Sequence, residues 1–104
     1  MILFVCTGNT CRSPMAAAMA RKMGLQAESA GLSAFPGMPA TPQALRAAQR
    51  HGGDLAGHRA RMVDAEMVKR ADAVIAFWDG ASRGTKSLIG YAKECGKALY
   101  IKRI

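Results

Sequence analysis

Side chains suited to nucleophilic chemistry and anion binding are concentrated in the stretch VCTGNTCRSP near the N-terminus. Cys6 and Arg12 enclose five residues, in the pattern Cys-x5-Arg, and Gly8, Asn9 and Ser13 stand beside them. A cysteine thiolate is a strong nucleophile, and an arginine guanidinium binds two oxygens of an oxyanion at once. Gly8 lets a ligand approach the backbone, Asn9 tolerates a left-handed conformation, and Ser13 can donate a hydrogen bond to the Cys6 sulfur. The spacing therefore favours a loop that binds an oxyanion and attacks it.

The backbone of this loop is expected to contribute as much as its side chains. When such a loop follows a strand and opens a helix, its N–H groups surround an anion, and the same field stabilises a thiolate. The predicted phosphate-binding set is therefore the whole loop up to the arginine: Thr7, Gly8, Asn9, Thr10, Cys11 and Arg12.

The three cysteines leave other interpretations open. Cys6 can instead be a buried apolar residue at a strand end, and Cys11 a structural residue or a disulfide partner that reversibly protects Cys6. The Cys-x4-Cys spacing weakly suggests zinc, but no second Cys/His pair stands near it, so we expect neither a metal nor another cofactor. An odd number of cysteines does not suit a secreted disulfide framework and favours a reducing, cytoplasmic location.

The loop needs a strand before it and a helix after it, and the sequence predicts both. The apolar run over residues 1–5 is typical of a strand buried on both faces of a parallel sheet, and Pro14 suits the first turn of a helix. The rest of the chain continues this alternation. We expect strands at 1–5, 25–29, 73–78 and 98–101, and helices at 15–23, 42–50, 65–70 and 85–94.

This alternation predicts one α/β domain over residues 1–104, flavodoxin- or Rossmann-like. We expect a three-layer sandwich around a four-stranded parallel sheet in the order 2-1-3-4. The loops after the first and third strands then open at the same edge of the sheet, where ligands bind in such folds. Helix caps are expected at Thr41, ahead of Pro42, at Asp64, and at Ser82 or Thr85.

The net charge of +8 restricts the class of partner. The basic residues are dispersed, with no nucleic-acid-binding motif, so the charge points to a phosphorylated or acidic substrate rather than to nucleic acid. No apolar run approaches the ~20 residues that span a bilayer, so no membrane partner is expected. The short apolar start lacks the basic segment of a signal peptide.

The loop resembles the signature of the low-molecular-weight protein tyrosine phosphatases, V-C-x-G-N-x-C-R-S-P. Similar segments continue at AESAG, at Phe35, at GHRAR and at ADAVIA, so the resemblance covers residues 1–76. It implies a metal-free reaction on phosphotyrosine-type substrates or phosphorylated small molecules, through a cysteinyl-phosphate. By the same resemblance Cys6 is the nucleophile and Arg12 the phosphate clamp, and Ser13 belongs to the catalytic set.

The resemblance also implies supporting roles. Asn9, Ser13, Ser29 and His58 match a hydrogen-bond network that holds the loop rigid. We expect His58 to be a scaffold residue rather than a base. Phe35 matches an aromatic wall for the substrate ring, although on a Pro/Gly-rich loop it can equally plug the core.

The sequence contains no match to the residue that acts as the general acid in this family. In the family it comes from an Asp-Pro loop after the fourth strand, and no Asp-Pro pair occurs here. The chain is thus expected to be truncated relative to the family, with catalysis weak or lost. Asp79 is the one acidic residue predicted at the right edge of the sheet, but a turn or cap role is the favoured reading.

The C-terminal stretch over residues 77–104 resembles another Rossmann-like group, the nucleotide-sensing SLOG/DprA-like domains, because a strand leads into DGASRGT and a helix. Ser82, Gly84 and Thr85 match that pattern, although a helix N-cap explains them without a ligand. The hypothesis from the sequence is a chimera of two segments, 1–76 and 77–104, engineered or naturally divergent.

Three functions remain open at this point. The first is a phosphatase, or a phosphate-binding remnant of one. The second is a thioredoxin-coupled arsenate reductase, which would need a further cysteine pair where only Cys95 remains. The third is a non-catalytic engineered scaffold with residual nucleotide binding.

Overall fold

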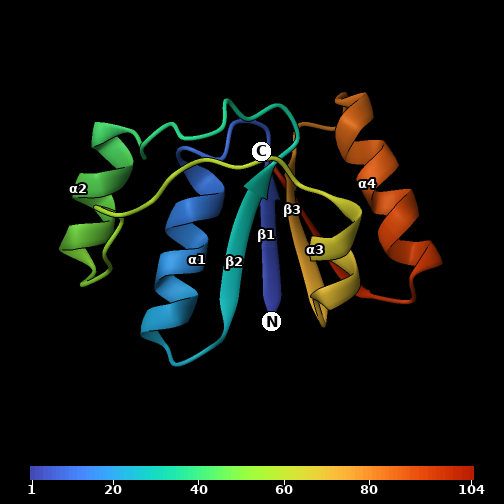
Figure 1. Cartoon of the computed structure of the whole chain (residues 1–104), viewed down its shortest axis with the longest axis horizontal. Coiled ribbons are helices and arrows are strands. Elements are labelled where there is room, and N and C mark those ends of the chain that lie inside the picture. The colour runs from blue at the N-terminus through green and yellow to red at the C-terminus, as the bar shows by residue number, and fades with distance from the viewer.

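The computed structural model describes all 104 residues and confirms the α/β fold (Figure 1). Its four strands form one parallel sheet in the order β2-β1-β3-β4, as the sequence predicts. The strands are β1 (Ile2–Cys6), β2 (Ala27–Gly31), β3 (Ala73–Trp78) and β4 (Ala98–Arg103). The helices are α1 (Arg12–Lys22), α2 (Pro42–Arg50), α3 (Ala65–Arg70) and α4 (Arg83–Glu94).

Helices cover both faces of the sheet and make three layers (Figure 1). On one face Phe4 of β1 packs against Ala17 of α1, and α2 packs on the outer side of α1. On the other face Val5 of β1 shares a core cluster with Val68 of α3 and Leu88 of α4. Alternate residues of β1 thus enter opposite cores, which is why the run needs apolar side chains throughout.

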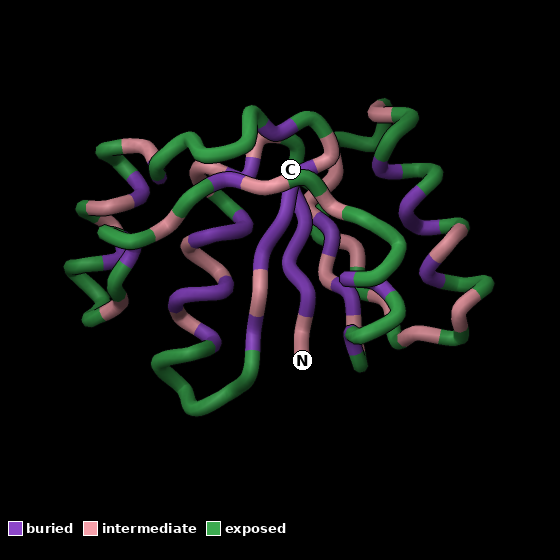
Figure 2. The backbone as a smooth tube through the Cα atoms, in the orientation of Figure 1, coloured by how far each residue is buried: buried purple, intermediate pink, exposed green.

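The central strand is the most deeply buried part of the chain (Figure 2). Leu3 and Val5 have no exposed surface, and Cys6 at the end of β1 is 7% exposed. The strand is paired on both sides, with Val5 opposite Ala30 of β2 and Ala76 of β3. The loop that follows Cys6 therefore begins from a rigid position.

The ends of the elements differ from prediction by up to three residues. Helix α1 begins at Arg12, so the predicted clamp residue belongs to its first turn and Pro14 follows within that turn. Helix α4 begins at Arg83 rather than at residue 85, because Ser82 and not Thr85 is its N-cap. The caps predicted at Thr41 and Asp64 are confirmed: each side-chain oxygen accepts a backbone N–H three residues on.

The loops after β1 and β3 open at the same edge of the sheet, at the top of Figure 1. None of the four helices is long and apolar enough to cross a membrane.

Candidate active site

The predicted phosphate-binding loop encloses a pocket of about 170 Å³ at the carboxyl end of β1. Cys6 lies in its wall together with every member of the predicted set. The lining residues are Cys6, Thr7, Gly8, Asn9, Thr10, Cys11, Arg12 and Ile104. The sequence prediction and the geometry therefore select the same residues, and Ile104 is the one that the sequence did not suggest.

Two hydrogen-bond donors reach the sulfur of Cys6. The Ser13 Oγ lies 2.9 Å from Cys6 Sγ, and the backbone N–H of Asn9 donates to the same sulfur over 3.3 Å. The amide of Asn9 donates to Ser13 Oγ, so the hydroxyl hydrogen of Ser13 is free to point at the sulfur. Both contacts direct a hydrogen-bond donor at the sulfur, the atom that would act as the nucleophile.

Asn9 is the centre of the network behind the loop. It is fully buried and is the chain's only non-glycine residue with a left-handed backbone, with φ of 55°. Its Nδ2 donates to Ser13 Oγ and to Ser29 Oγ, each over 2.9 Å, and its Oδ1 accepts the backbone N–H of Arg61 over 3.0 Å. Because that N–H can only donate, the orientation of the Asn9 amide is determined.

His58 completes the network from the backbone side. Its Nε2 lies 2.6 Å from the carbonyl oxygen of Asn9, and since a carbonyl only accepts, the hydrogen must be on Nε2. Three of the four residues that the family resemblance assigns to loop support, Ser13, Ser29 and His58, therefore each bond to the fourth, Asn9. His58 bonds a backbone carbonyl and lies outside the pocket lining, which fits a scaffold role.

The N-terminus of α1 opens into the pocket without a cap of its own. Its N-cap residue Cys11 makes no side-chain capping bond, and the first turn contains no acidic residue. The first backbone N–H groups of a helix lack partners within the helix, and its dipole attracts negative charge there. An uncapped helix N-terminus beside such a loop is an arrangement that can bind an anion.

Arg12 begins that helix and supplies the only charged side chain of the pocket lining. It is exposed, and no carboxylate of the chain pairs with it. At Gly8 an added side chain would meet only Thr10 Oγ1, at an ordinary 3.6 Å. Nothing within the chain therefore requires glycine at position 8, and close approach of a ligand remains the predicted reason.

The end of β2 fits tightly against the loop. Leu32 N–H donates to the Cys6 carbonyl over 3.0 Å, and Ser33 N–H to the Thr7 carbonyl over 2.9 Å. A Cβ at Gly31 would lie 2.7 Å from the Thr7 carbonyl oxygen and 3.0 Å from the Cβ of Asn9. Gly31 is thus needed for the loop to lie against β2.

The sequence profile described as "Low molecular weight phosphotyrosine protein phosphatase" matches residues 1–101. The chain belongs to this phosphatase family. It is 44% identical over 84 residues to the probable low molecular weight protein-tyrosine-phosphatase EpsP of Ralstonia nicotianae. The aligned segment covers 79% of this chain and 57% of EpsP. It is 42% identical over 78 residues to the phosphatase Etp of Escherichia coli K12, and that aligned segment covers 73% of this chain and 53% of Etp.

A solved structure gives the same result. The YwlE arginine phosphatase from Geobacillus stearothermophilus superposes with a TM-score of 0.78 at 36% identity, over 96% of this chain and 64% of YwlE. The chain thus spans little more than half the length of the named sequence relatives. The phosphatase match continues to residue 101, so the predicted junction near residue 77 and the SLOG/DprA-like segment are not supported.

Phe35 and Asp79, like the supporting residues Ser13, Ser29 and His58, lie outside the lining of the Cys6 pocket. Phe35 is 79% exposed, so it does not plug the core, and its role as a substrate wall stays a prediction. Asp79 caps a turn: its Oδ1 accepts the N–H groups of Ala81 over 2.8 Å and Ser82 over 3.0 Å. These two bonds lower the pKa of Asp79 below its ordinary 3.8, and a carboxyl that is ionised at neutral pH is a poor general acid.

The three cysteines form no disulfide bond in the structure. Cys6, Cys11 and Cys95 are all free thiols. Cys95 is the C-cap of α4, which begins at the loop edge and runs back to the opposite edge of the sheet. No group of three or more histidine, cysteine or acidic side chains is placed to hold a metal ion.

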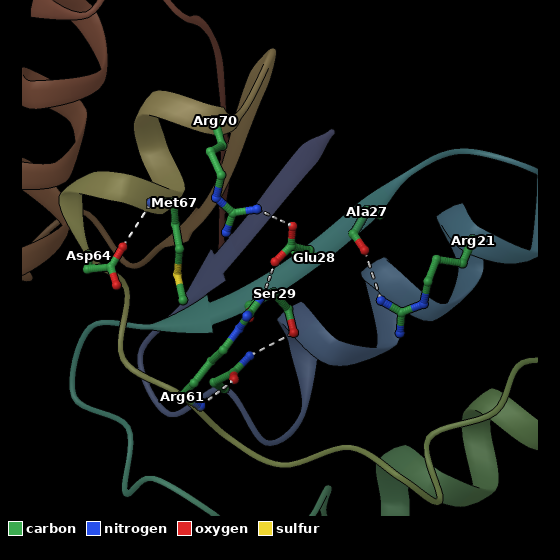
Figure 3. Close-up of polar contacts among 9 residues, drawn as sticks. Arg21, Ala27, Glu28, Ser29, Arg61, Asp64, Met67 and Arg70 are labelled. Carbon is green, nitrogen blue, oxygen red and sulfur yellow. Dashed lines mark hydrogen bonds and ion pairs between the residues drawn. The ribbon is translucent and has the colours of Figure 1, made fainter.

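Sequence reasoning missed the charged residues behind Asn9, which Figure 3 shows. Arg61 donates its Nε to the carbonyl of Ser29 over 3.0 Å, and its guanidinium pairs with Glu28. Glu28 also pairs with Arg70 over 3.1 Å. Glu28 and Arg61 lie 33 positions apart, in different segments, so no local pattern in one sequence links them.

Proposed function

We propose that the loop from Cys6 to Arg12 binds the phosphate group of a phosphomonoester or phosphoramidate, and that Cys6 attacks its phosphorus. The proposal rests mainly on the position of Cys6 Sγ. It lies in a pocket formed almost entirely by this loop, with Ser13 at 2.9 Å and the Asn9 N–H at 3.3 Å. Family membership supports the same assignment.

The proposed reaction has two steps. The sulfur of Cys6 forms a bond to phosphorus while the bond from phosphorus to the leaving oxygen or nitrogen breaks, and the leaving group takes up a proton. Water then attacks the cysteinyl-phosphate and releases phosphate and the thiolate. Arg12 and the N–H groups of the loop hold the phosphoryl oxygens through both steps, and the Ser13 hydroxyl stabilises the sulfur as it leaves.

The source of the proton determines the expected rate. None of the seven acidic residues in these 104 residues lines the pocket. A positioned general acid contributes ~10²–10⁴-fold to such a reaction. We therefore propose that the 104-residue chain by itself binds phosphate well and turns substrates over slowly.

The relatives name two classes of substrate. EpsP and Etp are named protein-tyrosine-phosphatases, whereas a relative from Geobacillus stearothermophilus, 42% identical over 82 residues, is named protein-arginine-phosphatase. We take phosphotyrosine as the first candidate substrate and phosphoarginine as the second. Action on cytoplasmic phosphoproteins, rather than on nucleic acid or at a membrane, remains our prediction.

Hydrolysis of p-nitrophenyl phosphate tests the proposal, with the wild type compared with Cys6→Ser, Asp79→Asn and, as the matched control, Cys95→Ser. We expect slow turnover that Cys6→Ser removes and the other two variants leave unchanged. Turnover that persists in Cys6→Ser contradicts the proposal. An absence of turnover, with inorganic phosphate still raising the melting temperature, would leave phosphate binding as the function. Phosphotyrosine and phosphoarginine peptides of one sequence then separate the two substrate classes.

A further inference from the structure

We propose that Glu28 and Arg61 are positioning residues that hold Asn9, and through it the Cys6 loop, in the conformation that binds phosphate. The inference rests on the proposed function, because it assigns these residues to the same site. Neither residue lines the pocket, so their influence on the sulfur has to pass through Asn9.

The first link runs from Arg61 to Cys6. The backbone N–H of Arg61 donates to Asn9 Oδ1 over 3.0 Å, and the backbone N–H of Asn9 donates to Cys6 Sγ over 3.3 Å. Asn9 is the residue that the loop holds in a left-handed conformation, at φ of 55°. A displaced Arg61 N–H would release the amide of Asn9 and allow its backbone to relax, which would withdraw one donor from the sulfur.

The second link fixes Arg61 on the edge strand β2. Its carbonyl accepts the N–H of Gly31 over 2.8 Å, and its Nε donates to the carbonyl of Ser29 over 3.0 Å. Its Nη2 pairs with Glu28, which lies next to Ser29 on the same strand. A lysine at position 61 has a single ammonium group instead of a planar guanidinium, so it cannot donate to the carbonyl and the carboxylate at once in the same geometry.

The third link is Glu28 itself, on which Arg61 and Arg70 converge from two sides (Figure 3). The hydrogen bond from Arg61, and after it that from Arg70, lowers the pKa of Glu28 below 4.5, so the carboxylate is ionised throughout the neutral range. Arg21 lines a surface cleft together with Glu28 and Arg61, but its guanidinium donates to the Ala27 carbonyl over 3.0 Å. Glu28 therefore connects β2 to the segment around Arg61 and to α3.

This arrangement predicts an effect that a simple stabilising contact would not have. Partly exposed ion pairs contribute little to the free energy of unfolding. Loss of the Glu28–Arg61 pair should therefore change the melting temperature little, yet change how tightly the loop binds phosphate and at which pH Cys6 reacts.

The experiment measures alkylation of Cys6 by iodoacetamide, with tandem mass spectrometry to separate Cys6 from Cys11. The rate is followed against pH and against inorganic phosphate concentration in the wild type, Glu28→Gln, Arg61→Lys and Glu28→Asp. Asp72→Asn is the matched control, because Asp72 pairs with the N-terminal ammonium group far from the loop.

We expect Glu28→Gln and Arg61→Lys to need about 10-fold more phosphate to protect Cys6, the size of one hydrogen bond to a charged group. Their alkylation profile should also shift to higher pH. Glu28→Asp should recover part of both properties, and Asp72→Asn should match the wild type in both.

If Glu28→Gln and Arg61→Lys kept the phosphate protection and the pH profile of the wild type, the inference would be overturned. Equal losses in Asp72→Asn would overturn it as well, because they would indicate general destabilisation. A failure of the proposed function would give a different result from a failure of this inference, because phosphate would then not protect Cys6 in the wild type. The pH profiles without phosphate would still report whether Glu28 and Arg61 position the loop.

Discussion

Two strand-to-helix turns lie at the same edge of the sheet and differ in how they treat the helix N-terminus that follows. After β1 the helix α1 has no side-chain cap and no acidic residue in its first turn. After β3 the chain supplies its own groups: Asp79 accepts two backbone N–H groups and Ser82 caps Thr85 of α4. Both helices begin with an arginine, Arg12 and Arg83.

The comparison separates fold from function. Both turns meet the needs of a strand–turn–helix unit, so the topology alone does not mark either as a site. The β3 turn satisfies its N–H groups internally, and its carboxylate supplies the negative charge that a helix N-terminus favours. The β1 turn directs its polar side chains inwards, to Asn9, and pairs Arg12 with no carboxylate. The loop N–H groups and Arg12 are the groups that we propose bind an anion.

The largest difference between the turns should appear in phosphate binding. Arg12→Ala is expected to weaken binding about 100-fold, because two charge-assisted hydrogen bonds to the phosphoryl oxygens are lost. Arg83→Ala removes the matched arginine of α4 and should leave affinity within error. Isothermal titration with inorganic phosphate checks both, and equal losses would mean that charge alone binds the anion.

Asn9→Ala tests the inward-directed network of the β1 turn. It should lower the free energy of unfolding by about 3 kcal/mol, because buried groups of Ser13, Ser29 and Arg61 lose their partner. Asn9→Gly tolerates the left-handed backbone and should lose about 1 kcal/mol less. Urea denaturation measures both. A loss from Asn9→Ala no larger than that from Asp79→Ala, in the exposed turn, would contradict the comparison.

Ser82→Ala tests the self-capped turn after β3. The loss of an N-cap should lower the free energy of unfolding by about 1 kcal/mol. Phosphate affinity should not change, because Ser82 does not line the pocket. Ser82→Thr keeps the capping oxygen and is the control. A parallel fall in phosphate affinity would show that the two turns are coupled.

The smallest effect concerns pH. The N–H groups of Ala81 and Ser82 lower the pKa of Asp79 in the folded chain below its ordinary 3.8. The unfolded chain then binds the proton more readily, so Asp79 contributes stability above about pH 4 that is lost as pH falls through the lowered pKa. The difference in melting temperature between wild type and Asp79→Asn should therefore shrink towards acid pH. A difference that grows on acidification would contradict the assignment.

The fold and the pocket were predictable because their signals are local. The apolar run before Cys6, the caps at Thr41 and Asp64, and the regular alternation of elements each lie within a few residues, and together they led to the observed sheet order. The segment after residue 76 resembles a different group only through a short Ser/Gly/Thr pattern, and the same pattern is also an ordinary helix start. The cap at Ser82 and the family match through residue 101 correct that reading.

The sequence by itself determined where the pocket loop lies and which residues are its candidate nucleophile and clamp, Cys6 and Arg12. The reason is that the signal is local: a strand end, a glycine, an asparagine and an arginine stand at fixed spacing within one loop. The tertiary structure alone decided what holds that loop. Glu28 and Arg61 meet because β2 lies beside β1 and the segment before α3 crosses its end, with Gly31 bonded to the carbonyl of Arg61. Such contacts depend on chain packing over tens of residues, and no spacing in one sequence encodes them.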